Sequence, residues 1–181
     1  LDAGLFTIVA SGNDIWGTAD NFHFNYAKVT GAFDVQVRVE SLEMANTWSK
    51  AGLMARESLA PGSRHADILA TPTGGQNIFN MQWRDTTDGG SASKAGAERL
   101  GPVPYPNAWV RLVREDPASN EFKSYIDLTG ASATTPDWGD AEYHVYTIPG
   151  DLLPESLFIG LAVTSHDDAL STEAVFGNLT F

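Results

Sequence analysis

Alternation of apolar and polar residues dominates the chain and predicts β-strands. In Phe33–Glu40 four apolar residues alternate with four polar ones, and in Asn21–Tyr26 aromatic residues occupy every second position. Side chains of a strand point to opposite faces in turn, so such a segment has one buried face and one wet face. Ile78–Arg84 alternates in the same way, whereas Leu157–Val163 is almost continuously apolar. The continuous run is typical of a central strand that is covered on both faces.

Seven further short segments have strand composition. They are Leu5–Ala10, Ala51–Ser58, Ala66–Thr71, Trp109–Arg114, Phe122–Leu128, Tyr143–Ile148 and Ala174–Phe181. Turn residues separate the segments, and no stretch longer than a turn or two has a helical period. About eleven short strands at this spacing predict an all-β, two-sheet antiparallel β-sandwich or jelly roll. With no linker or repeat along the chain, we expect a single domain over residues 1–181. Two stretches, Asp85–Gly101 and Thr129–Glu142, are expected to be long loops.

Composition narrows the function classes. The 181 residues include no cysteine, 11 Lys and Arg, and 23 Asp and Glu, for a net charge of −12. Disulfides, thiol nucleophiles and thiolate zinc sites are therefore excluded. The negative charge argues against nucleic acid and anionic membranes as partners, and no apolar run is long enough to span a bilayer. Because the chain starts at Leu1 without an initiator methionine, we expect a processed protein or a module of a larger multi-domain protein or assembly.

The sequence lacks the common catalytic signatures. Phosphate-binding glycine loops, the GxSxG elbow and the HExxH zinc motif are absent, and the four histidines have no metal-ligand spacing. A glycosidase needs two carboxylates that flank the scissile bond, but no predicted strand carries alternating Asp or Glu. The sequence therefore favours a non-catalytic protein. A hydrolase remains an alternative, because carboxylates from distant strands can converge in one cleft.

Acidic residues gather in loops, where calcium ligands are usually found. The pairs Asn13-Asp14, Asp20-Asn21 and Asp167-Asp168 offer the carboxylate and amide oxygens that calcium prefers. We therefore predict a structural calcium ion with Asp14, Asp20, Asp167 and Asp168 as ligands. The alternative is that these carboxylates are solvated or stabilise turns.

Aromatic and polar side chains supply the candidates for carbohydrate binding. Sugar rings pack their C–H faces on indoles, and their hydroxyls bond polar side chains. Asn80, Gln82 and Arg84 share one face of their predicted strand, which lies beside Arg56 of a neighbouring segment. Trp83 either fills the core or belongs to this polar surface. Trp138 lies in a turn-rich loop, where an exposed and a buried side chain are equally expected. The candidate ligand-binding residues are Arg56, Gln82, Trp83, Arg84, Trp138 and His166.

Four motifs in order resemble a known domain family. They are Ala10–Phe24, Trp48–Leu59, Trp109–Arg114 and Ile159–His166. Together they resemble the concanavalin A-like, LamG-like jelly-roll domains of secreted bacterial proteins, which are often appended to polysaccharide-degrading enzymes. The resemblance covers nearly the whole chain, but the hairpin after the third motif departs from the family pattern. It implies a secreted or cell-surface protein in which a face or rim of the sandwich binds a glycan.

Residues within these motifs have structural interpretations as well. Glycine at Gly12 and Gly17 permits positive φ angles in a tight loop, and Trp16 is expected to plug one end of the sandwich. Arg56 is either buried with a carboxylate partner or lines a groove. His166 either caps a turn or faces a ligand.

Three functions remain open from the sequence. The first is a non-catalytic extracellular carbohydrate-binding module. The second is a structural or adhesive domain of a bacterial surface layer, filament or scaffold. The third is a polysaccharide hydrolase or lyase on the same fold.

Overall fold

The chain is built from β-strands. A computed structural model describes residues 4–94, 100–140 and 142–181. The strands in these ranges are β1 Phe6–Gly12, β2 His23–Thr30, β3 Phe33–Leu42, β4 Lys50–Arg56, β5 His65–Ala70, β6 Phe79–Arg84, β7 Ser91–Ser93, β8 Ala108–Arg114, β9 Glu121–Ile126, β10 His144–Thr147, β11 Ser156–Thr164 and β12 Asp167–Thr180. The described ranges contain no helix with the length and hydropathy needed to cross a membrane.

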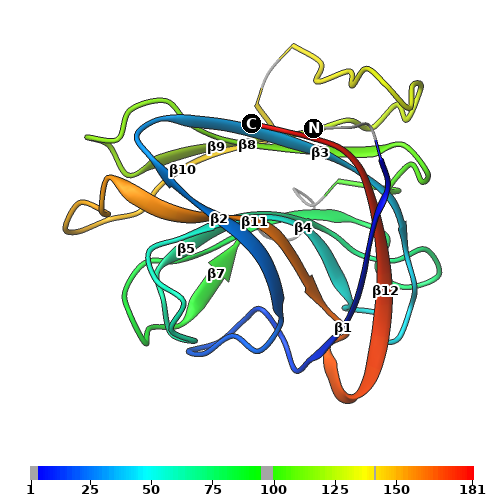
Figure 1. The fold of residues 1–181 in the computed structure, drawn as a ribbon, viewed down its shortest axis with the longest axis horizontal. Coiled ribbons are helices and arrows are strands. Elements are labelled where there is room, and N and C mark those ends of the chain that lie inside the picture. Colours follow the sequence, from blue (N-terminus) through cyan, green and yellow to red (C-terminus); the bar gives the residue numbers. More distant parts are fainter. Residues whose placement is uncertain (1–3, 95–99, 141) are drawn as a thin grey trace.

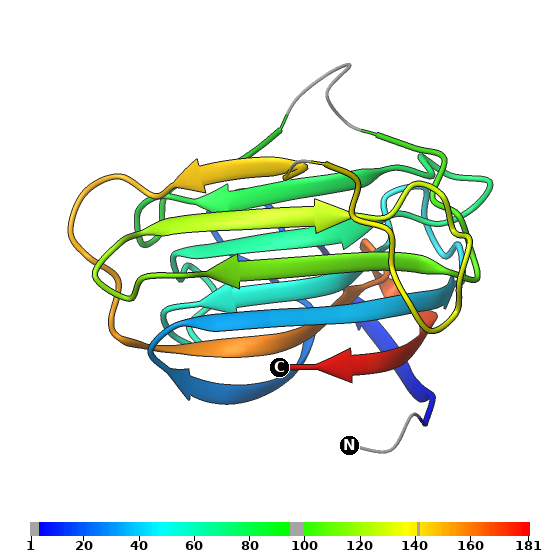
Figure 2. The same ribbon diagram turned by 90° about the horizontal axis from the view of Figure 1, so that it is seen from above.

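Two antiparallel sheets pack face to face (Figures 1 and 2). Sheet A has the strand order β1-β12-β3-β8-β9-β10, and sheet B has the order β2-β11-β4-β5-β6-β7. Five of the ten neighbouring pairs join strands that are distant in sequence, and the other five join consecutive strands. The distant pairs are typical of a jelly roll rather than a simple meander. The predicted two-sheet antiparallel sandwich is confirmed.

Alternate residues of both sheets fill the space between them. From sheet A these include Val35, Val37 and Val39 of β3, and from sheet B they include Leu53 of β4 and Ile159 of β11, all fully buried. The alternation that predicted the strands therefore also identifies the side that faces the core.

Sheet B departs from the predicted alternation in burial. Every residue of β4, β5 and β6 is buried, although the pattern predicted one wet face for β6. The cause is the loop of residues 13–22, between β1 and β2, which crosses the outer side of sheet B (Figure 1). This second buried layer forms the candidate site.

Two element boundaries differ from expectation. The stretch Asp85–Gly101, expected to be a loop, contains the short strand β7, which pairs with β6; residues 95–99 lie outside the described residues. The last strand begins at Asp167 rather than Ala174, because its first part pairs with β1. The other expected loop, Thr129–Glu142, has no strand in its described residues and lies over the outer side of sheet A (Figure 1).

Candidate functional site

The loop of residues 13–22 is fixed to sheet B by an apolar contact. Ile15 is fully buried and packs against Met54, Leu69 and Ala162 on the outer side of the sheet. From the sequence, Trp16 is expected to plug one end of the sandwich. The structure corrects this, because Ile15 is the buried residue and Trp16 remains 39% exposed. Ala162 of β11 is the small residue of this contact.

Glycines shape this loop at its start and in its middle. Gly12 has φ 141° and Gly17 has φ 63°, which confirms the positive φ angles expected there. A Cβ atom on Gly12 would lie 2.2 Å from the backbone oxygen of Asn21. The chain therefore needs glycine at this position both for its conformation and for the close approach of the two ends of the loop.

A buried ion pair anchors the far end of the loop. Arg84 donates to both carboxylate oxygens of Asp20 and to the backbone oxygen of Gly17. Arg56 lies 3.4 Å from Asp20 and donates to the backbone oxygen of Ala60 at 2.6 Å. Burial lowers the pKa of Arg56, and the Asp20 carboxylate opposes that shift. Both arginines are buried with a carboxylate partner, and neither lines the pocket described below. Arg56 also lines a second hollow beside the loop, so both alternatives expected for it apply.

A histidine continues this charged layer to a second aspartate. The Nδ1 atom of His65 is 3.7 Å from Asp20, and its Nε2 atom is 3.3 Å from Asp67. Neither oxygen of Asp67 has a hydrogen-bond partner with good geometry. Burial raises the pKa of Asp67, and the Asp20 carboxylate adds to that effect while His65 and Lys50 oppose it.

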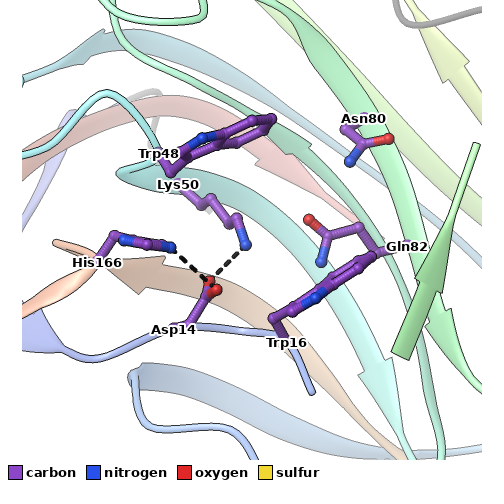
Figure 3. Close-up of a pocket in the computed structure, with 7 residues that line it drawn as sticks. All are labelled: Asp14, Trp16, Trp48, Lys50, Asn80, Gln82 and His166. Atoms are coloured by element: carbon purple, nitrogen blue, oxygen red, sulfur yellow. Dashed lines mark hydrogen bonds and ion pairs between the residues drawn. The ribbon is translucent and has the colours of Figure 1, made fainter. Parts of the chain in front are cut away.

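Beside the anchored loop lies a pocket of about 340 Å³. Its lining residues are Asp14, Trp16, Trp48, Lys50, Asn80, Gln82 and His166. They come from the 13–22 loop, the connection before β4, the start of β4, the outer face of β6 and the turn between β11 and β12. Figure 3 shows the indoles of Trp16 and Trp48 on opposite sides of the Lys50 ammonium group.

Asp14 organises the charged side of the pocket. One of its carboxylate oxygens accepts from Lys50 Nζ at 2.5 Å and from the backbone N–H of Ile15 at 2.7 Å. The other oxygen is 3.1 Å from Nε2 of His166. Lys50 also lies 5.8 Å from the centre of the Trp16 ring, a cation–π distance. His166 has φ 61°, an uncommon conformation for a residue with a side chain, and this conformation is often found at functional sites.

Two amides form the opposite side of the pocket (Figure 3). Gln82 donates through Nε2 to the backbone oxygen of Ile15 at 2.8 Å, which ties the loop to β6. Asn80 is only 3% exposed, and its Oδ1 atom has no hydrogen-bond partner among the described residues. Buried polar atoms are nearly always bonded, so an unpartnered oxygen on a residue that lines the pocket is unusual.

The structure brings Gln82 and His166 of the predicted ligand set together, but not the tryptophans of that set. Trp83 is corrected to a core residue: it is 8% exposed and stacks on Tyr146 with ring centres 3.8 Å apart. Strand alternation requires this, because Gln82 and Arg84 face outward. Trp138 lies against Tyr125 on the outer side of sheet A, so it belongs to a different surface.

Five pocket residues were not among the predicted ligand-binding residues. They are Trp16, Trp48, Lys50, Asn80 and Asp14, the last of which was predicted as a calcium ligand. The sequence did indicate Asn80, because it is a polar residue on the same face of β6 as Gln82, which was predicted to bind the ligand. Lys50 is indicated in the same way, because it lies on the same outward face of β4 as Arg56, another predicted ligand-binding residue. For the two tryptophans, the sequence contained no signal that their loops meet over sheet B.

The four predicted calcium ligands are not brought together. Asp14 is held by Lys50 and His166, and both oxygens of Asp20 are held by Arg84. Asp167 accepts a hydrogen bond from the backbone N–H of Ala169, as in a turn-stabilising carboxylate, and Asp168 is exposed at the start of the same strand. Within the described ranges, no three His, Asp or Glu side chains are grouped to hold a metal. A structural calcium ion stays a prediction from the sequence.

Comparison with known proteins identifies the fold. No family model and no curated relative matches the sequence. A functionally unknown protein from Saccharomyces cerevisiae superposes with a TM-score of 0.70 at 17% identity, over 99% of this chain and 88% of that one. A mutant of the GH43 protein BlXynB from Bacillus licheniformis has a TM-score of 0.51 at 10% identity, over 95% of this chain and 32% of that one. These likenesses show the fold alone, a two-sheet antiparallel jelly-roll sandwich.

Proposed function

We propose that this chain is a non-catalytic carbohydrate-binding domain and that a sugar unit lies in the pocket between Trp16 and Trp48. The observation that carries the proposal is the combination of two indole walls with amide and charged groups in one hollow. A sugar ring presents apolar C–H faces that pack on indoles, and hydroxyls that bond amides and charged groups. Pockets with apolar walls and a few fixed polar groups are typical of small-ligand sites.

The Asn80 amide supports a ligand rich in hydroxyl groups. Burying a polar atom without a partner costs about 1–3 kcal/mol. Rotation of the Asn80 amide that turns Oδ1 towards the pocket would let a sugar hydroxyl donate to this oxygen and recover that cost, and hydroxyls can also accept from donors on the same wall. An apolar ligand would leave the cost in place.

The loop that forms the pocket is held before any ligand arrives. Ile15, Gln82 and Lys50 fix one part of it, and the Asp20–Arg84 pair fixes another. A preformed site loses little affinity to ordering. We expect affinities on the order of micromolar to millimolar, as for other shallow sugar sites. The acidic charge and the resemblance to domains of secreted proteins support an extracellular setting within a larger protein.

Titration of the protein with soluble glycans tests the proposal. We expect at least one glycan to bind, with tryptophan fluorescence and NMR shifts that report on Trp16 and Trp48. Replacing Trp48 by alanine should weaken binding by about tenfold or more, because truncating an interface tryptophan often costs ~2 kcal/mol or more. The matched control is Trp138→Ala, which removes a half-buried tryptophan from sheet A. Absence of binding across a broad glycan panel, or equal loss in both variants, would overturn the proposal.

A polysaccharide hydrolase or lyase is the second candidate, and one observation favours it. His166 is oriented by a carboxylate at the rim of the pocket, the arrangement used by a general base. In that case polysaccharide is turned over, and His166→Ala abolishes turnover while binding remains. Incubation of the protein with the same glycan panel, followed by reducing-end analysis, separates the two candidates.

A further inference from the structure

Three adjoining hollows follow the 13–22 loop across sheet B. The middle hollow shares Asp14, Trp16 and His166 with the tryptophan pocket. It shares Asp20, Asn21 and Pro61 with a third hollow on the far side of the loop. The volumes are about 340, 530 and 410 Å³. Each neighbouring pair has lining residues in common, so the three hollows adjoin one another along the loop, and together they are called the groove.

An aromatic row walls the far end of this groove. Phe22, Phe24 and Tyr26 line the third hollow, with ring centres 5.6 Å and 5.3 Å apart along β2. Tyr26 also makes an edge contact with Phe158 of β11, and it is 45% exposed. Alternate residues of an edge strand thus place several aromatic rings on the same outer side as the tryptophan pocket. Both ends of the groove offer ring surfaces, and the successive rings have a spacing comparable to the length of a pyranose unit.

The charged residues that line the groove are balanced. Lys50 is paired with Asp14, and Arg56 lies beside Asp20. Lys50 and Arg56 are 4% and 2% exposed, and both already donate to backbone oxygens. Among the residues that line the three hollows, the cations are therefore engaged within the protein. The net charge of −12 adds a long-range repulsion against acidic chains.

We infer that the groove holds several consecutive units of an uncharged glycan chain, which runs from the tryptophan pocket over the loop to the aromatic row on β2. This inference rests on the proposed function, because it names the class of ligand that occupies that site. Each ring surface adds contact with a further unit, so affinity should increase with chain length until the groove is full.

Length-series titration tests this inference. The probes are cello-, manno-, xylo- and galacto-oligosaccharides from one to six units, with oligogalacturonides and alginate oligomers as acidic chains. For at least one neutral series we expect affinity to rise with each added unit and then level off. Tyr26→Ala should weaken binding of the longest neutral oligomer by about tenfold and leave binding of the shortest detectable oligomer unchanged. Tyr125→Ala, on the outer side of sheet A, is the matched control.

The outcomes separate this inference from the proposed function. Binding that needs Trp48 but does not strengthen with length overturns the extended groove and leaves the sugar pocket standing. Stronger binding of the acidic chains overturns the assignment to uncharged glycans. Absence of binding to every series overturns both proposals. Thermal unfolding of each variant confirms that it is folded at the temperature of the titration.

Discussion

Arg84 donates hydrogen bonds to both carboxylate oxygens of Asp20, at 2.8 and 2.6 Å, and neither side chain has exposed surface. The two residues are 64 positions apart in the chain. Their pairing fixes the 13–22 loop on sheet B and so determines the shape of the groove.

Removing Asp20 should strongly destabilise the protein. Asp20→Ala leaves the Arg84 guanidinium buried without its carboxylate, and breaking a buried pair in this way costs about 3–5 kcal/mol. Urea unfolding measures the loss. The control is Asp34→Ala, which removes the carboxylate of an exposed pair with Arg111 and should cost less than about 1 kcal/mol. Similar losses in the two variants would contradict an anchoring role for Asp20.

Replacing the carboxylate of Asp67, in contrast, should stabilise the protein, and the gain in the free energy of unfolding should depend on pH. Burial raises the pKa of Asp67, so the folded state holds a proton that the unfolded state has already released. The free energy of unfolding therefore decreases as pH rises from the ordinary aspartate range through the raised pKa. Asp67→Asn removes this dependence, so we expect the variant to gain stability relative to the wild type as pH rises from the ordinary aspartate range, near pH 4, to neutral pH.

Urea unfolding across this pH range measures the difference between the two proteins. The control for loss of one negative charge is Asp168→Asn, at an exposed position. A variant less stable than the wild type at neutral pH would indicate that Asp67 is ionised and stabilised by His65.

Local sequence pattern was sufficient for the fold but not for the site. Alternation along β6 implied that Trp83 and Gln82 face opposite sides of the sheet, yet it could not say which side would be the core. Glycine at Gly12 and Gly17 indicated a tight loop. Nothing in the residue spacing indicated that this loop would fold back over sheet B.

The missing information is long-range. Whether an aspartate binds calcium or pairs with a basic side chain depends on which loops lie next to it in the fold. Asp14, for example, pairs with His166, which lies near the other end of the chain. For the same reason, the sequence could place Arg56 on a strand face without showing that the face is covered. Polar residues on an expected wet face were the best available pointer, and Asn80 was among them.

Ile15 should couple the stability of the loop to ligand binding. Ile15→Ala opens a cavity between the loop and sheet B, and such truncations cost about 2–5 kcal/mol. Because Asp14 and Trp16 flank Ile15, we also expect weaker glycan binding than in Ile159→Ala, which truncates an equally buried isoleucine in the main core. Calorimetric titration well below the melting temperature of each variant measures this. Equal affinities in the two variants would show that the loop keeps its position without the Ile15 contact.

Asn80 should affect binding much more than stability. The Oδ1 atom of Asn80 has no hydrogen-bond partner, so Asn80→Ala breaks no hydrogen bond through that atom. The free energy of unfolding should therefore change by less than about 1 kcal/mol. Asn120 is the matched control. It is 4% exposed, accepts from the N–H of Leu153 and donates to the backbone oxygens of Ile148 and Asp151. Asn120→Ala should therefore cost several times more stability, about 2–4 kcal/mol, and leave glycan affinity unchanged.

The opposite order is expected for affinity. Loss of the Asn80 amide removes a hydrogen bond to a sugar hydroxyl in the pocket wall, so Asn80→Ala should weaken glycan binding by about tenfold. Unfolding and titration of the same two variants thus separate a residue kept for the ligand from one kept for the fold. If Asn80→Ala binds glycan as tightly as the wild type, the unpartnered oxygen has no part in recognition, and sugar contact in the pocket must rest on the two tryptophans and the Asp14 cluster.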